Sequence, residues 1–443
     1  MTNTLALKAA LSRGQTAVIY VALLTLATWN YLDRAALGIL QEPIKREFSL
    51  SDFQLGLLGG PAFALLYVVM GLPFARLAER VNRVRLIAAV FALWSLMTML
   101  CGAATSFAFL LLTRAGVSVG EAGCSPSAHS LIADHFAPER RPFALAVFTS
   151  GVSLGSLVAA LAGGAIAQTL GWRAAFYALG ASGLLLAAAF LVAVPEAPRS
   201  TSVETTPSFS DALKLLFARP VVWHVAFGTM VAAMMGFSMT QYMTSFFIRT
   251  HGLPLRDATL HVALVNGLSG AVGTFLGGFL GNYLSRRGGL AGAARVCAIG
   301  FLVSAPLFAL GFLVPDTTIA TAMLMVGTMS QLMYFGPAFS IVHASVEPRM
   351  RATAIAVVLL IVNLLGYGLG PPVLGAVSDK LAELLGRTDG VTPQLCAAAS
   401  WLRAACAAPK AGGLQWGLAM LAIGNFWAYF HFHRVSRLFR TAA

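Results

Sequence analysis

The sequence predicts an all-α membrane protein with twelve transmembrane helices arranged as two parallel six-helix repeats. Three observations lead to this fold class. First, 58% of the 443 residues are hydrophobic and only 11% are charged, whereas about a quarter of the residues in an ordinary soluble protein are charged. Second, the apolar residues gather in twelve long stretches. Third, segments of the second half of the chain repeat segments of the first.

Each predicted helix is an apolar stretch of about 20 residues, the length that crosses the hydrocarbon layer. Backbone polar groups find no water in lipid, so such stretches form helices or closed barrels. Barrel strands would be about ten residues of alternating polarity, and these stretches are apolar on all sides. The predicted spans are 16–40, 54–75, 85–105, 107–133, 142–167, 172–194, 221–247, 258–283, 293–314, 317–344, 352–377 and 412–433.

The basic residues between the spans predict the orientation. With a cytoplasmic N-terminus, 19 of the 30 Lys and Arg residues lie on the cytoplasmic side and 9 on the other side, while Arg34 and Arg114 lie inside spans. The positive-inside rule then places both termini in the cytoplasm, and we expect a bacterial inner membrane protein. The net charge is +13, but the basic residues form no single patch, which argues against nucleic-acid binding.

The two halves are separated by the longest polar interruption between early and late helices. We therefore expect an N-terminal six-helix bundle over 1–194, a cytoplasmic linker over 195–220 and a C-terminal six-helix bundle over 221–443. Parallel halves of this kind place a substrate site between them near the midplane, and rocking of the halves gives alternating access. We expect the protein to act as a monomer.

Two pairs of matching segments support the repeat. Arg141 begins RPFALAVF at the fifth span, and Arg351 begins RATAIAVV at the eleventh, 210 residues later (351 − 141). Ala75 begins ARLAER after the second span, and Gly281 begins GNYLSR after the eighth, 206 residues later (281 − 75). Two matches at nearly one offset are hard to explain by chance.

Four charged residues lie well inside the apolar spans: Asp33 and Arg34 in the first, and Arg114 and Glu121 in the fourth. Ionisable groups in a bilayer are costly and face a cavity or a partner. Arg114 and Glu121 are separated by roughly 700° of turn and about 10 Å, so they share one helix face. Asp33 and Arg34 point about 100° apart. Asp33 can therefore meet Arg114 while Arg34 packs elsewhere, although the sequence leaves the pairing open.

These buried charges suggest a coupling mechanism. Burial raises the pKa of a carboxylate and a neighbouring arginine lowers it, so a carboxylate that changes partner during rocking takes up or releases a proton. Our hypothesis is that Asp33 and Glu121 carry protons and that Arg34 and Arg114 set their proton affinity. The alternative is a static charge cluster that fixes helix packing.

Charges at the cytoplasmic ends of the spans predict a gate. Glu79 stands beside several arginines after the second span and can pair across the loop to lock the cytoplasmic face. Plain topology charge is the alternative. The predicted gate residues are Glu79, Arg80, Arg83, Arg141, Arg286 and Arg351.

Uncharged polar residues complete the predicted substrate cavity, which would have a charged N-terminal wall and a softer C-terminal wall. Met239 and Met333 add adaptable apolar surface, although ordinary packing explains methionines equally well. His129 is either a titrating group or a packed polar residue. The predicted substrate-binding residues are Asn30, Tyr31, His129, Gln241, Tyr242, Asn266, Tyr334, Asn363 and Tyr367.

No enzyme chemistry is indicated. The buried residues contain no nucleophile–base pair, and the sequence has no metal-ligand spacing and no phosphate-binding glycine loop. We therefore expect no cofactor, no metal and no primary pump. Cys396 and Cys406 fall in a predicted outward loop, where either a disulfide or two free thiols would fit.

The loop after the second span resembles the signature loop of the major facilitator superfamily. It contains Leu77, Glu79 and Arg80 followed by a basic cluster, with Ala75 and Asn82 where that loop has glycines. The resemblance implies the major facilitator fold.

Two further motifs resemble the spinster-like branch of that superfamily. Asn30 to Arg34 with Gly38 is similar to its helix 1, and Gly120 to Gly123 with Ser125 and Pro126 is similar to its helix 4. His129 stands where the pattern more often has proline. The resemblance implies transport of lysophospholipids or sphingosine phosphates, in some members coupled to protons. Both motifs also resemble anion:cation symporters, so a proton-coupled transporter of small organic anions or drugs is the alternative.

Overall fold

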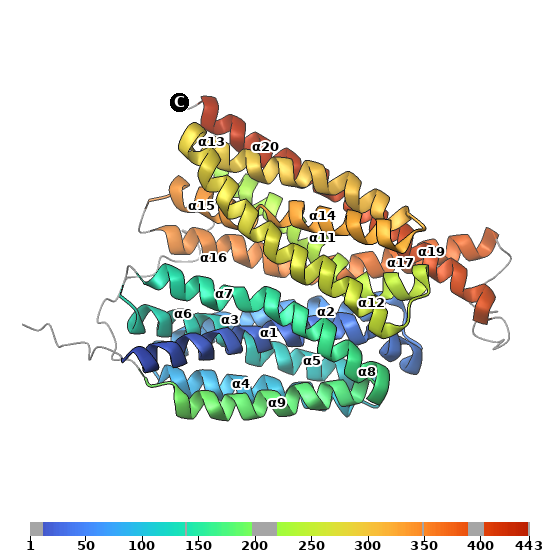
Figure 1. The fold of residues 1–443 in the computed structure, drawn as a ribbon, viewed down its shortest axis with the longest axis horizontal. Helices are drawn as coiled ribbons and strands as arrows, with labels where there is room; N and C mark the ends of the chain where they lie inside the picture. Colours follow the sequence, from blue (N-terminus) through green and yellow to red (C-terminus); the bar gives the residue numbers. More distant parts are fainter. Residues whose placement is uncertain (1–11, 138–139, 197–218, 348–349, 389–402, 442–443) are drawn as a thin grey trace, which may run out of the picture. The chain divides into compact units, whose positions relative to one another are not determined.

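The computed structural model describes residues 12–137, 140–196, 219–347, 350–388 and 403–441, and all regular structure in these residues is helical (Figure 1). Most of the predicted linker over 195–220 lies outside the described residues. So do Cys396 and the side chain of Cys406, so the two alternatives for these cysteines stay open.

All twelve predicted spans fall on helical segments. In the first half these are α1 (Arg13–Phe48), α2 (Asp52–Gly59), α3 (Pro61–Ala78), α4 (Arg83–Gly102), α5 (Phe107–Ala122), α6 (Cys124–His135), α7 (Arg141–Val158), α8 (Gly164–Leu170) and α9 (Trp172–Ala193). In the second half they are α11 (Pro220–His251), α12 (Leu255–Val262), α13 (Ser269–Leu313), α14 (Thr317–Leu332), α15 (Phe335–Ser345), α16 (Arg351–Ile361), α17 (Gly368–Thr388), α19 (Arg403–Ala422) and α20 (Gly424–Thr441).

Nine helical stretches in the described part of the chain are long and apolar enough to cross a membrane. The longest, Leu255–Leu313, has 59 residues and covers two predicted spans. It bends at Gly288 and Gly289, and Gly289 has a φ of +59° that only glycine adopts without strain. The predicted loop between the eighth and ninth spans is therefore a sharp bend within α13.

Contacts divide the chain into two compact units that cut across the sequence halves. The first unit contains Met1–Asp33, Leu66–Gly155 and Arg173–Glu204, and the second contains Arg34–Leu65, Ser156–Trp172 and Thr205–Ala443. Residues 34–65 and 156–172, which precede the linker, thus pack with the second half of the chain. The predicted boundaries at 194 and 221 describe chain order and stay a prediction.

In the first unit, helix α7 lies unusually close to α1 because small residues line the contact. A Cβ atom at Gly155 would stand 2.4 Å from the carbonyl oxygen of Thr28, and one at Gly151 would stand 2.5 Å from Cβ of Ala27. Glycine at both positions lets the two backbones approach. This contact fixes the part of α1 that leads to Asp33.

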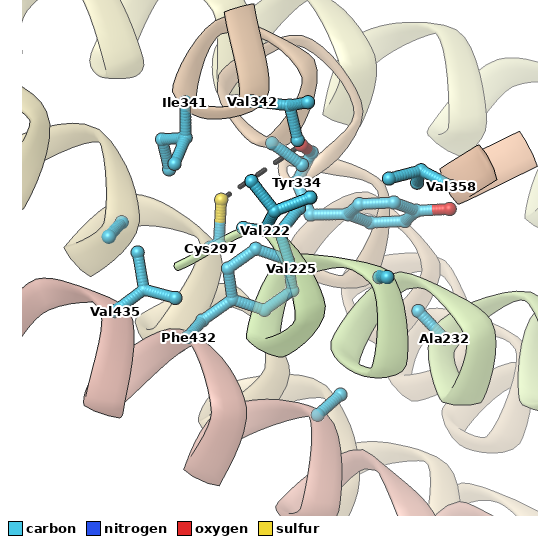
Figure 2. Packing of buried hydrophobic residues seen from close by; sticks show 14 of the residues in the cluster. Val222, Val225, Ala232, Cys297, Tyr334, Ile341, Val342, Val358, Phe432 and Val435 are labelled. Carbon is cyan, nitrogen blue, oxygen red and sulfur yellow. Dashed lines mark hydrogen bonds between the residues drawn. The ribbon is translucent and has the colours of Figure 1, made fainter. Parts of the chain in front are cut away.

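The second unit is built around a large apolar cluster. Figure 2 shows Val222 and Val225 of α11, Cys297 of α13, and Phe432 and Val435 of α20 meeting in it. The Cys297 thiol lies 3.9 Å from the carbonyl oxygen of Tyr334. Helix α13 runs beside both α14 and α20 (Figure 1).

In the described residues, three of the predicted spans contain a π-helical segment, in which hydrogen bonds span five residues instead of four. These are η1 (Ala159–Gly163), η2 (Ala263–Leu268) and η4 (Val362–Tyr367). They interrupt the fifth, eighth and eleventh predicted spans. The starts of η1 and η4 are 203 residues apart (362 − 159), close to the offset of the repeated sequence segments.

Candidate functional site

The centre of the candidate site is an ion pair between Asp33 of α1 and Arg114 of α5, both in the first unit. Arg114 Nη1 donates to Asp33 Oδ1 over 3.1 Å, and the Thr98 hydroxyl of α4 donates to the other carboxylate oxygen. Asp33 is 4% exposed and Arg114 1%. The two side chains that helical spacing could bring together do meet, and a third helix holds the carboxylate in place.

Glu121 lies two turns further along α5, one residue before that helix ends at Ala122. It is fully buried in the first unit. Gly123 separates α5 from α6, and a Cβ there would stand 2.9 Å from the side chain of Val90. Arg114 and Glu121 therefore form a charged face on one buried helix, as the spacing predicts.

Arg34 follows Asp33 in sequence but has different surroundings. Its guanidinium carbon lies 4.8 Å from the ring centroid of Phe63, within the second unit. A cation over an aromatic face is stabilised by the ring quadrupole. Arg34 therefore packs elsewhere while Asp33 holds Arg114.

A second group of buried charges, which we call the Arg249 cluster, consists of Glu42, Lys45, Asp52 and Arg249 in the second unit. Arg249 Nε donates to Glu42 over 2.7 Å, and its two terminal nitrogens each donate to Asp52 over 2.8 Å. Lys45 also contacts the Asp52 carboxylate. The two cations balance the two carboxylates.

Further hydrogen bonds tie Asp52 to the second half of the chain. Its carboxylate accepts from the Ser378 hydroxyl over 2.7 Å, and its carbonyl accepts from the Tyr242 hydroxyl over 2.5 Å. The Asp379 carboxylate accepts from the backbone N–H groups of Asp52 and Phe53 over 3.0 and 2.9 Å. An anion is favourable at this position because α2 begins there, and the first N–H groups of a helix have no partner within the helix itself.

Sequence reasoning missed the Arg249 cluster because its members sit at the ends of predicted spans, where charges are ordinary. One signal was available: Glu42 and Lys45 are three residues apart and so share a helix face. Extending the first span to include them would have indicated a helix with charges that need partners. Helix α1 does continue to Phe48, eight residues beyond the predicted end.

Gln241 and Tyr242, both predicted to bind substrate, are buried in packing contacts in this conformation. Gln241 Nε2 donates to the Leu55 carbonyl over 2.9 Å. A Cβ atom at Gly59 would stand 2.2 Å from the side-chain oxygen of Gln241. Tyr242 reaches Asp52, as described above. Both residues therefore join α11 to residues 34–65.

The other predicted substrate residues are spread over both units. In the first unit Asn30 is buried and Tyr31 half-buried, while His129 is exposed with its ring edge-on to Phe148 at 5.8 Å.

In the second unit Asn266 is half-buried within η2, and Tyr334 lies in the apolar cluster (Figure 2). Asn363 donates to the Leu359 carbonyl over 2.7 Å, and the Tyr367 ring is 5.0 Å from Phe237. Their role in binding stays a prediction.

Arg83, a predicted gate residue, is buried and pairs within the first unit. Its guanidinium contacts Asp134 of α6, and its Nε donates to Glu196, just after α9, over 2.7 Å. Burial tends to raise the pKa of Glu196, but hydrogen bonds from the backbone N–H of Val84 and from Arg83 hold that pKa below its ordinary value. Arg83 thus fastens three helix ends together.

Two of the remaining predicted gate residues, Arg141 and Arg351, make the same kind of contact in the two halves of the chain. Arg141 Nε donates to the Phe136 carbonyl over 3.1 Å, and Arg351 Nε donates to the His343 carbonyl over 3.0 Å. Each arginine begins one helix and holds the end of the preceding one. Glu79, Arg80 and Arg286 have exposed side chains.

Comparisons with known proteins agree with this architecture. Residues 23–381 match the family model of the Major Facilitator Superfamily. An MFS-type efflux pump of Mycolicibacterium smegmatis is 35% identical over 365 residues, which cover 81% of this chain and 83% of that protein. Protein spinster homolog 1 of Mus musculus is 29% identical over 397 residues, 84% of this chain and 74% of that protein.

A solved structure extends the comparison to the fold. It is the crystal structure of a bacterial homolog to the human lysosomal transporter Spinster, in an inward-facing and unoccupied conformation. It superposes with a TM-score of 0.86 at 31% identity and covers 97% of this chain and 98% of that one. The chain therefore belongs to the major facilitator superfamily, as a spinster-like, multi-pass membrane transporter rather than an enzyme.

Proposed function

We propose that the protein is a proton-coupled secondary transporter of amphipathic lipids, such as a lysophospholipid or a sphingosine-phosphate-like molecule, that works by alternating access. The observation that carries the proposal is the buried Asp33–Arg114 pair with Thr98. Asp33 and Glu121 carry protons, and Arg34 and Arg114 tune their proton affinity. The protein works in a bacterial inner membrane with both termini in the cytoplasm.

The coupling follows from charge balance in a medium of low dielectric constant. A buried carboxylate without an arginine is unstable as an anion, so it binds a proton. When a proton binds Asp33, the attraction to Arg114 is lost and the guanidinium becomes available to an anionic headgroup. Loss of the proton restores the pair and releases the headgroup. Glu121, two turns away on α5, acts in this proposal as the second proton carrier.

The Arg249 cluster is proposed as the closed gate on the outer side. It ties residues 34–65 to α11 and α17, so these contacts must break for the outer side to open. Glu79, Arg80, Arg83, Arg141, Arg286 and Arg351 would form the cytoplasmic gate, with Arg83 acting through the Asp134 and Glu196 contacts. Breaking one gate while making the other is what alternating access requires.

The substrate class rests on two considerations. A charged head can meet Arg114 while a tail lies along apolar helix surface, and curated relatives include spinster proteins. A second candidate substrate is a small organic anion or drug, because a relative at 35% identity is named an efflux pump.

The test uses purified protein in vesicles with an imposed pH gradient and a panel of lysolipids, organic anions and drugs. We expect gradient-dependent uptake of a lysolipid that Asp33→Asn and Glu121→Gln abolish. The matched controls are Asp257→Asn, at an exposed position, and Glu383→Gln, a partly exposed residue that pairs with Lys380 and Arg387. Uptake that ignores the gradient, or full activity of both site variants, would refute proton coupling. Uptake confined to organic anions would select the second candidate.

A further inference from the structure

Helix α20 has two chemically different faces. One face packs inward, where Phe432 and Val435 enter the apolar cluster with Ala428 (Figure 2). Ser436 on the same side donates to the Ala291 carbonyl of α13 over 3.1 Å. This packing fixes the rotation of the helix about its axis, so the opposite face is held outward.

The outward face begins with a large aromatic stripe. Phe426 is 44% exposed, Trp427 59% and Phe430 50%. Trp427 follows Phe426 directly and Phe430 comes four residues after Phe426, so the three form a continuous strip over the first turns of α20. Exposed aromatic side chains of this kind face lipid in a membrane protein, and tryptophan favours the level of the headgroups.

Three arginines continue the same face. Arg434 lies four residues after Phe430, and Arg437 and Arg440 follow at intervals of three; all three side chains are exposed. Together with Leu438 they line a cavity of about 470 Å³. From Arg434 to Arg440 the helix rises about 9 Å. The cavity volume lies within the range of small-molecule sites, roughly 300–1,000 Å³.

We propose that this face of α20 binds one anionic phospholipid, with the phosphate-bearing headgroup on Arg434, Arg437 and Arg440 and an acyl chain along Phe430 and Trp427. Basic pockets at the edge of transmembrane helices recognise such headgroups. The arginine forks are suited to phosphate oxygens. The site shares no residue with the Asp33–Arg114 pair and does not depend on which molecule is transported.

Topology alone would not require this arrangement. Basic residues that only set orientation can stand anywhere in a cytoplasmic segment. Here all three line one cavity, on the face that bears the aromatic stripe and opposite the face that packs inward. The order along the helix, apolar first and basic last, is the order of a lipid tail and its headgroup.

The test is native mass spectrometry of the full-length protein in detergent, titrated separately with phosphatidylglycerol, cardiolipin and phosphatidylcholine. We expect the two anionic lipids to be retained and phosphatidylcholine to be lost. Arg434→Gln/Arg437→Gln/Arg440→Gln should weaken phosphatidylglycerol binding at least about tenfold. The matched control is Arg256→Gln/Lys380→Gln/Arg387→Gln, three exposed cations elsewhere, which should retain binding.

Two further arms separate a lipid from a soluble phosphate compound. Trp427→Ala/Phe430→Ala should weaken phosphatidylglycerol binding, and glycerol phosphate should raise the melting temperature of the protein far less than the lipid does. Equal protection by glycerol phosphate would overturn the lipid assignment. Equal loss of binding in the α20 triple variant and in the control triple variant, or no preference over phosphatidylcholine, would overturn the site itself. If the triple variant unfolds, Arg434→Gln alone is measured and must weaken binding.

Discussion

Arg249 and Asp52 are joined by two parallel hydrogen bonds, from Nη1 to Oδ2 and from Nη2 to Oδ1, each 2.8 Å long. The two residues lie 197 positions apart, one in α11 and the other at the start of α2. A forked contact of this kind is stronger and more specific than a single bond. Because the pair is buried, its loss leaves charges without compensation.

We expect Arg249→Gln to destabilise the protein by about 3–5 kcal/mol, because it leaves Asp52 and Glu42 buried next to a single cation. Arg249→Lys should recover only part of this, since lysine cannot form the fork. The measurement is the melting temperature and the free energy of unfolding in detergent. Arg387→Gln, which breaks an exposed contact with Glu383, should leave the free energy of unfolding almost unchanged, because exposed ion pairs contribute little to stability. Equal losses would argue against a buried gate.

Thr98→Val should destabilise the first unit by about 1–3 kcal/mol, because one oxygen of the buried Asp33 carboxylate loses its hydroxyl donor. Thr98→Ser keeps the hydroxyl donor, so its free energy of unfolding should stay close to that of the natural protein. Thr149→Val, at an exposed position on α7, is the control for the substitution itself. The measurement is the unfolding curve of the natural protein and of the three variants. Unchanged stability of Thr98→Val would mean that the hydroxyl does not hold Asp33.

Glu196 should make stability depend on pH. The pKa of Glu196 is held below its ordinary value of 4.5 by its bonds to Val84 and Arg83, despite burial. Its contribution to stability is therefore full above pH 4.5 and is lost as the pH falls through the lowered pKa of the folded state. Melting temperature measured from pH 3 to 7 should fall more steeply in the natural protein than in Glu196→Gln. Parallel curves would show that the Arg83 contact does not matter.

Gly155→Ala should cost about 1–3 kcal/mol, because the new methyl group would stand 2.4 Å from the Thr28 carbonyl and force α7 away from α1. Gly71→Ala is the matched control, since nothing lies within 4 Å of a Cβ at that position. It should be neutral or slightly stabilising. The melting temperatures of the two variants give the comparison, and a similar effect from both would contradict the close approach.

Apolar length was enough to predict the helices, and helical angle allowed an Asp33–Arg114 pair without selecting it. The twelve spans fall on helices, and the structure shows that Asp33 pairs with Arg114 while the Arg34 guanidinium lies over the Phe63 ring. Spacing along one helix cannot show which helices touch, so Asp134 and Glu196 were not foreseen as partners of Arg83. The end of α1 was placed too early because Glu42 and Lys45 appear unfavourable until Arg249 and Asp52 neutralise them.

The three π-helical segments have a mechanical consequence. Each segment holds one residue more than the α-helical turn that it replaces. That extra residue can move along the helix while only one or two hydrogen bonds are broken at a time. The residues that it passes shift by about 1.5 Å along the helix axis and turn by about 100° around it. A helix that slides against its neighbour inside the membrane can therefore change its register in small steps and keep most of its backbone hydrogen bonds.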